Sequence, residues 1–144
     1  MANPHPGYGD HFVLAGVSSD APFVNRLVAA LPEDSYGQVF LEGTGPSRVL
    51  GWPGPARLVP FWLRQDLAPA VDGRLPGPGD VLAAALRAWA DEWLPEPGHR
   101  GVLPFTVWIG GAGHRPVDEL CRRLTLSYPG LHLHHPESAA ARGE

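Results

Sequence analysis

Two glycine-containing turns are the segments of this sequence best suited to hold a ligand. The first, GVSSD at residues 16–20, follows an apolar run at 12–15 and precedes a helical pattern that has Pro22 in its first turn. The second, GGAG at 110–113, follows the apolar run 105–109. A turn between a buried strand and a helix presents backbone N–H groups to an anion, and glycine lets a phosphate approach the backbone. The pattern predicts a nucleotide-type site.

Neither turn completes the dinucleotide fingerprint G-x-G-x-x-G. The first has a single glycine, and the second continues into His114, Arg115 and Pro116, so its third glycine is missing. Ser19 or Asp20 can cap the following helix. The alternative that both turns are plain strand-to-helix connections without a ligand therefore stays open. His114 and Arg115 could contact a phosphate or simply be exposed.

Other reactive side chains give weaker signals. Cys121, the only cysteine, excludes an internal disulfide and a multi-cysteine zinc site, and its apolar surroundings predict an inert thiol. His132 and His134 share one face of the last strand, but two ligands without a nearby carboxylate make a poor metal site. We therefore predict no catalytic residue and no metal ligand.

The composition excludes several classes of function. The net charge is −4, and the eleven basic residues are all arginine, spread along the chain, so no nucleic-acid partner is expected. No apolar run reaches the length of a membrane span, and the N-terminus lacks a signal-peptide pattern, so we expect a cytoplasmic protein. The length predicts one domain at 11–136, with a lead-in at 1–10 and a tail at 137–144. The sequence contains no feature that predicts the oligomeric state.

The hydrophobic patterning predicts alternating strands and helices. Strands are expected at 12–15, 38–42, 57–64, 105–109 and 131–135, and helices at 20–31, 80–94 and 116–128. Pro60 places the third strand at an edge, and Asp80 is expected to cap the second helix. The long loop 43–56, with Trp52 exposed, is a candidate functional loop. Such alternation is typical of an α/β fold in which helices cover both faces of a parallel sheet.

The side chains expected to face the core follow the helical period. In the first helix they are Phe23, Val24, Leu27, Val28 and Leu31; in the second Val81, Leu82, Ala85, Leu86, Trp89 and Trp93; in the third Val117, Leu120, Cys121 and Leu124.

The order of these segments resembles the C-terminal NAD(P)H-binding domain of the siderophore-interacting protein family. These proteins are flavin-dependent ferric-siderophore reductases related to ferredoxin reductases. The matching stretches are HFVLAGVSSDAPFVNRLVAALP, YGQVFLEG, RLVPFWLRQD, RAWADEWLP and FTVWIGGAGHRPVDELCRRL, which cover nearly the whole chain. The resemblance implies a three-layer Rossmann-like fold with a five-stranded parallel sheet in the order 3-2-1-4-5.

The resemblance also implies a nicotinamide nucleotide lying across the two glycine turns, with its adenosine near the end of the third strand. The cofactor-binding residues implied in this way are Gly16, Val17, Ser18, Ser19, Asp20, Pro22, Arg64, Gln65, Gly110, Gly111, Ala112 and Gly113.

Three departures from the family limit what the chain is expected to do alone. The flavin-binding barrel is not in the sequence, Gly111 stands where the family carries an acidic residue, and an aromatic, arginine-rich ending is replaced by LHLHHPESAAARGE. Without flavin, hydride from NAD(P)H has no acceptor within the chain. We therefore expect a stand-alone nucleotide-binding domain that acts with a separate flavoprotein, and no autonomous reductase. The alternative is a non-catalytic interaction or scaffold protein with its contact surface on the loop 43–56.

Overall fold

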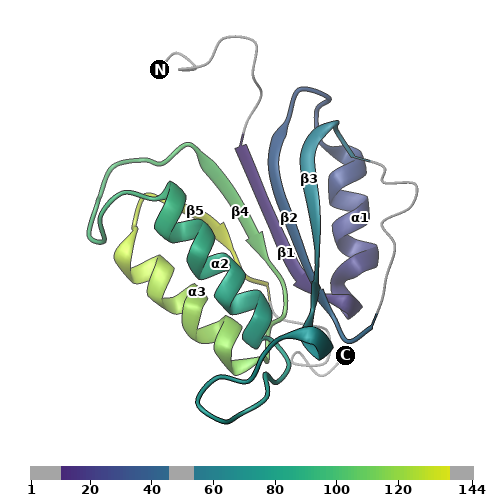
Figure 1. Cartoon of the computed structure of the whole chain (residues 1–144). Helices are drawn as coiled ribbons and strands as arrows, with labels where there is room; N and C mark the ends of the chain where they lie inside the picture. The colour runs from purple at the N-terminus through teal and green to yellow at the C-terminus, as the bar shows by residue number, and fades with distance from the viewer. Residues whose placement is uncertain (1–10, 46–53, 137–144) are drawn as a thin grey trace.

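A five-stranded parallel sheet with the order β3-β2-β1-β4-β5 forms the centre of the molecule (Figure 1). The computed structural model describes residues 11–45 and 54–136. Its strands are β1 (His11–Val17), β2 (Tyr36–Gly43), β3 (Arg57–Arg64), β4 (Phe105–Ile109) and β5 (His132–His134). The predicted α/β class and the predicted strand order are both confirmed.

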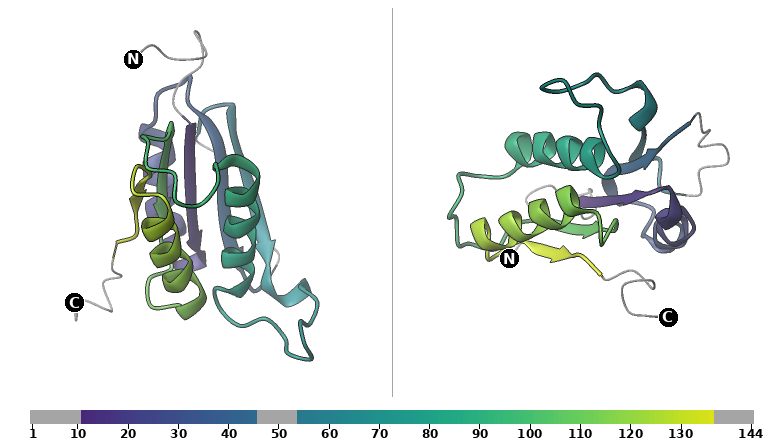
Figure 2. Two further views of the ribbon diagram at one scale, coloured as in Figure 1. Left: turned by 90° about the vertical axis from the view of Figure 1, so that its left-hand side faces the viewer. Right: turned by 90° about the horizontal axis from the view of Figure 1, so that it is seen from below.

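Three α-helices cover the two faces of this sheet. α1 (Ala21–Ala30) packs on one face, while α2 (Asp80–Trp93) and α3 (Arg115–Ser127) lie together on the other (Figure 2). Short 3₁₀ turns, Ser18–Asp20 and Gln65–Leu67, follow β1 and β3. Because the strands are parallel, their carboxyl ends lie together at one end of the sheet, the carboxyl edge, and the connections that lead into α1, α2 and α3 begin there.

The apolar core has two parts, one on each face of the sheet. On the α1 face, Val24 and Val28 pack against Leu58 and other strand residues. On the opposite face, Leu86 of α2 and Ile109 of β4 belong to a larger cluster that also contains α3. Full burial of each such side chain contributes about 1.5–3 kcal/mol, so the two clusters fix the helices against the sheet.

Several sequence predictions match the structure closely. The inward face of α3 is as expected, since Val117, Leu120, Cys121 and Leu124 are all buried. β3 lies at an edge of the sheet, as Pro60 predicted, because a proline without an N–H group does not interrupt the hydrogen bonds between central strands there. Among the described residues no helix is long and apolar enough to cross a membrane. The predicted lead-in 1–10, the tail 137–144 and the loop residues 46–53, Trp52 included, lie outside the described residues.

The predicted inward faces of α1 and α2 need correction. In α2 the buried set includes Ala83 and Ala90, whereas Trp93 is 43% exposed. Small side chains let the helix approach the sheet, and Trp93 lies at the helix end, where its ring meets His11 edge-on. In α1, Phe23 is 42% exposed and stacks on Trp108 with ring centroids 5.1 Å apart. Helical period alone does not show how completely the surrounding elements cover each inward side chain.

The start of α2 also differs from the prediction. Asp80 is the first helical residue, and its carboxylate accepts a hydrogen bond from the Gly77 backbone N–H at 2.7 Å. The N-cap is Gly79, which has a φ of +89°. The cap is supplied from a distant strand, as described below, so Asp80 shapes the preceding loop instead of capping the helix.

His11 lies in an aromatic cluster at the start of β1. Its side chain is buried, its ring lies near Tyr36 and Phe105, and its Nε2 is 2.9 Å from Gln38 Oε1. Burial lowers the pKa of His11, with the hydrogen bond to Gln38 opposing that shift. The folded state therefore favours the neutral ring.

We expect acidification to destabilise the protein through His11. Because the folded pKa lies below the unfolded value near 6.5, the unfolded chain binds more protons as the pH falls below about 6.5, and the free energy of unfolding decreases there. Urea unfolding at pH 7.5 and 5.5 measures this loss in the wild type and in His11→Gln. The variant, which keeps a polar side chain without titrating, should lose less; equal losses in both proteins would refute the assignment.

Candidate functional site

The two glycine turns predicted to hold a ligand lie side by side. β1 and β4 are neighbours in the sheet, with Ala15 opposite Ile109. The Gly110 N–H donates to the Ala15 carbonyl oxygen at 2.8 Å, which joins the strand ends directly. This junction is the topological switch point of the sheet, the place where open α/β folds bind ligands.

The carboxylate of Asp20 fills the space between the turns. Its Oδ2 accepts hydrogen bonds from the backbone N–H groups of Val17 and Gly111, each at 2.9 Å. A Cβ atom added to Gly16 would lie 2.7 Å from Asp20 Cβ, and one added to Gly110 would lie 2.6 Å from Asp20 Oδ2. Both glycines are therefore needed to accommodate an aspartate of the chain itself.

The predicted capping of α1 by Ser19 or Asp20 is wrong. Asp20 occupies the N-cap position, but its side chain makes no cap hydrogen bond to the helix. A 3₁₀ turn precedes α1, and this turn directs the Asp20 carboxylate back toward Val17 and across to Gly111. The sequence placed an acid at the helix start correctly but could not show its partner Gly111, which lies in the turn after β4.

Two further carboxylates accept backbone N–H groups near the starts of α2 and α3. Glu42, at the end of β2, is buried and accepts from Gly79 N–H and Leu82 N–H, both at 2.8 Å. Asp118 accepts from Gly113 N–H at 3.2 and 3.3 Å. A carboxylate is favoured at a helix N-terminus by the free N–H groups and by the helix dipole.

These contacts decide how the site fits a nucleotide. The N–H groups of Val17 and Gly111 point at one position and already bind an anionic group there, so the position suits a phosphate in charge and donor geometry. The same carboxylate occupies the volume and repels a second anion. A pyrophosphate fits between the turns only after the Asp20 side chain has left.

The remaining predicted residues of the turns form the rim of this position. Those that are exposed or partly exposed are Val17, Ser18, Ser19, Pro22, Ala112 and Gly113. Gly111 is buried with a φ of +73°, and Gly113 is exposed with a φ of +94°. Such left-handed conformations require glycine, so these two positions are explained by backbone geometry with no ligand.

Arg64 and Gln65 lie apart from the glycine turns, at the end of the edge strand β3. Both Arg64 hydrogen bonds run to the Asp66 carboxylate, at 2.8 and 2.6 Å, and this contact lowers the pKa of Asp66. Gln65 Nε2 donates to the Pro76 carbonyl oxygen at 3.2 Å. The charge of Arg64 is therefore balanced by Asp66, which weakens the implied role of Arg64 in cofactor binding.

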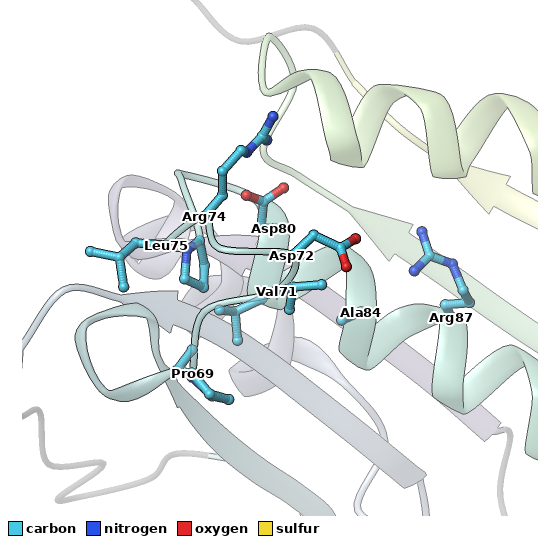
Figure 3. A pocket seen from close by; sticks show the side chains of 11 residues that line it. Pro69, Val71, Asp72, Arg74, Leu75, Asp80, Ala84 and Arg87 are labelled. Carbon is cyan, nitrogen blue, oxygen red and sulfur yellow. The ribbon is translucent and has the colours of Figure 1, made fainter.

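A cavity of about 630 Å³ lies just beyond β3, between the loop 68–76 and α2. Figure 3 shows Pro69, Val71 and Leu75 on the loop side and Arg87 on the helix side. Val71 and Arg74 pair through two backbone hydrogen bonds, at 2.9 and 3.0 Å, which fix this wall as a tight hairpin. This segment is not among the sites predicted from the sequence, although its D-G turn pair was an available signal.

The other candidate groups have structural explanations. Burial, with Asp118 nearby, raises the pKa of the Cys121 thiol to about 12, which agrees with the predicted inert thiol. Arg115 is exposed and paired with Glu119 at 2.9 Å. Within 11–45 and 54–136, no group of three or more His, Cys, Asp or Glu side chains is placed to hold a metal ion.

Comparison with known proteins gives a consistent answer at the level of the fold. A siderophore utilization protein from T. fusca aligns with a TM-score of 0.59 and 20% identity over 90% of this chain. The chain has the fold of siderophore-interacting proteins. SipS from Aeromonas hydrophila aligns with a TM-score of 0.51 and 18% identity over 93% of the chain, and the siderophore-interacting protein from Acinetobacter baumannii with 0.56 and 11% over 99%.

The chain spans about half the length of these proteins, covering 45%, 55% and 52% of theirs. No family model matches the sequence, and no curated protein matches it significantly. Sequence identities of 11–20% establish a shared fold. The resemblance to the siderophore-interacting protein family is therefore confirmed for the fold.

Proposed function

We infer that this chain binds a nicotinamide nucleotide at the carboxyl edge of its sheet and serves a separate flavoprotein in ferric-siderophore reduction. The observation that carries this inference is the anion position at the switch point, where two backbone N–H groups from different turns converge on Asp20 Oδ2. The shared fold with proteins named for siderophore use supports the biological setting. A bound NAD(P)H would supply the hydride that the flavin accepts.

The residues have separate tasks in this function. The Val17 and Gly111 N–H groups would hold the pyrophosphate, assisted by the dipole of α1. The adenosine would extend toward β3, where the cavity beside the loop 68–76 gives it room. Among the described residues Arg74 and Arg87 border that cavity without an ion pair, so they are better placed to attract a 2′-phosphate than the Asp66-bound Arg64.

Nucleotide titration tests the proposed function directly. NADPH and NADH are added separately to the purified chain while tryptophan fluorescence is recorded, with isothermal titration calorimetry as an independent measure. Saturable binding of either nucleotide is the expected result. If neither produces a saturable signal at millimolar concentration, in the wild type or in the Asp20 variant described next, the function is rejected.

Removing the Asp20 carboxylate is expected to tighten nucleotide binding. In Asp20→Ala the N–H groups of Val17 and Gly111 lose their anion and the repulsion of a phosphate disappears. We expect the affinity to rise about tenfold, which corresponds to roughly 1.4 kcal/mol of binding free energy. This is less than the energy of two hydrogen bonds to a charged group. Calorimetric titration of both proteins with NADPH measures the change.

Two matched variants separate charge from general disturbance. Asp20→Asn keeps a side-chain oxygen that can accept a hydrogen bond but removes the charge, so its affinity should lie between those of wild type and Asp20→Ala. Asp34→Ala removes an exposed carboxylate in the turn before β2 and should leave affinity unchanged. A weaker affinity in Asp20→Ala than in wild type would show that the carboxylate does not compete with the ligand.

A second function is favoured by one specific observation. Carboxylates of the chain itself, those of Asp20, Glu42 and Asp118, accept backbone N–H groups at the strand–helix connections of this edge, so these N–H groups have partners without a phosphate. A non-catalytic interaction protein would need only this fold. Failure of nucleotide binding in both wild type and Asp20→Ala, combined with loss of a bound partner in Trp52→Ala, would support it.

A further inference from the structure

Two histidine side chains converge on the exposed face of the edge strand β5. His132 Nε2 lies 2.6 Å from His134 Nε2, and the two ring centroids are 4.6 Å apart. Both residues are exposed. Nitrogen atoms of both rings therefore point at the same position on this face of the strand.

The strand holds this pair in a fixed place. His132 is in register with Thr106 and His134 with Trp108 of β4, so both rings project from the same side of the sheet. The next residue, His135, fastens the strand end, with Nδ1 at 2.7 Å from the Ile109 carbonyl oxygen and Nε2 at 2.7 Å from Asp118 Oδ1. Two histidines separated by one residue therefore meet without the help of a flexible loop.

The geometry is close to that of two ligands on one metal ion. Metal–nitrogen bonds of about 2.0–2.1 Å at angles between square-planar and tetrahedral place the two nitrogens about 2.9–3.4 Å apart. The observed Nε2 separation of 2.6 Å needs to widen by only a few tenths of an ångström, which exposed rings can do by rotating. His135 does not supply a third ligand, because both of its nitrogens are already engaged.

Against the sequence expectation that these two histidines make a poor metal site, we propose that His132 and His134 form a two-histidine chelate for a borderline divalent cation, with Cu²⁺ bound more tightly than Zn²⁺. Imidazole nitrogen suits these ions, and the order follows the general affinity series for such donors. The other coordination positions take water or a small chelating ligand, for which a cavity of about 490 Å³ lined by His134, Trp108 and Leu133 gives space. Binding of the ion replaces the contact between the two ring nitrogens.

Titration with Cu²⁺ tests the chelate on the intact chain. Because Trp108 lines the same cavity as His134, a bound Cu²⁺ should quench its fluorescence in a saturable way with one ion per chain. His132→Ala and His134→Ala should each weaken binding at least about tenfold, since the second ligand adds through a high effective concentration. Mg²⁺, which prefers oxygen ligands, should produce no change.

Matched controls decide the origin of any signal. His99→Ala removes an exposed histidine elsewhere and should bind Cu²⁺ like the wild type. Trp108→Phe should bind with unchanged affinity in calorimetry but lose most of the quenching. Undiminished Cu²⁺ affinity in the His132→Ala, His134→Ala double variant, or equal loss in His99→Ala, overturns the proposal. Circular dichroism of each variant verifies that the fold is retained, and none of these outcomes depends on nucleotide binding.

Discussion

Replacing Glu42 with alanine is expected to lower the free energy of unfolding by about 3 kcal/mol, because it removes both acceptors of a buried helix cap. The carboxylate is 3% exposed and receives the N–H groups of Gly79 and Leu82, each at 2.8 Å. Without it, two buried donors at the start of α2 have no partner and the helix dipole loses its counter-charge. The midpoint of urea unfolding measures the loss.

Two further substitutions test the cause of this destabilisation. Glu42→Gln keeps the side-chain length but turns one acceptor into an amide donor that faces an N–H, so it should cost about 1–2 kcal/mol. Glu33→Ala, at an exposed carboxylate after α1, should change stability by less than about 0.5 kcal/mol. A loss in Glu42→Ala no larger than that in Glu33→Ala would mean that α2 does not need this cap.

The second large effect is expected at Gly37, which lies near the start of β2. Its φ is +140°, and a Cβ atom added there would overlap the carbonyl oxygen of Phe12 on the neighbouring strand β1. The overlap involves two central strands, so neither side can move without disturbing the sheet. We expect Gly37→Ala to destabilise the protein by roughly 3 kcal/mol or more, from backbone strain and overpacking combined.

Chemical unfolding and the yield of folded protein together measure this effect. Gly45→Ala is the matched control, because a Cβ atom there meets nothing within 4 Å and the residue has no positive φ. The control should unfold within about 0.5 kcal/mol of the wild type. If Gly37→Ala were as stable as Gly45→Ala, the close approach of β2 to β1 would have to be wrong.

The glycine turns show why a residue pattern can have two causes. Glycine after a strand is expected where a phosphate approaches the backbone, and the sequence led to that interpretation. In the structure, Gly16 and Gly110 have the same requirement because the Asp20 carboxylate lies against both. In the sequence, a turn whose N–H groups bind an aspartate looks the same as a turn whose N–H groups bind a phosphate. Only the tertiary contact between Asp20 and Gly111 shows which of the two is present.

The sequence was sufficient for the local features of the fold. Apolar runs, proline and glycine positions and the helical period predicted five strands, three helices and the edge position of β3, and the structure confirms them. The inward face of α3 was correct because that helix is strongly amphipathic and its buried residues all lie in the core cluster that it shares with α2. The predicted inward faces of α1 and α2 were partly wrong, since the side chains of Phe23 and Trp93 are both exposed.

What the sequence alone determined, then, is the α/β architecture and the positions of the two glycine turns, because both depend on neighbours in the chain. The tertiary structure decided what occupies those turns. Asp20 reaches Gly111 across 91 residues, and Glu42 reaches Gly79 across 37. Such contacts depend on which strands and helices lie side by side, and the separation along the chain leaves no periodic signal that could reveal them.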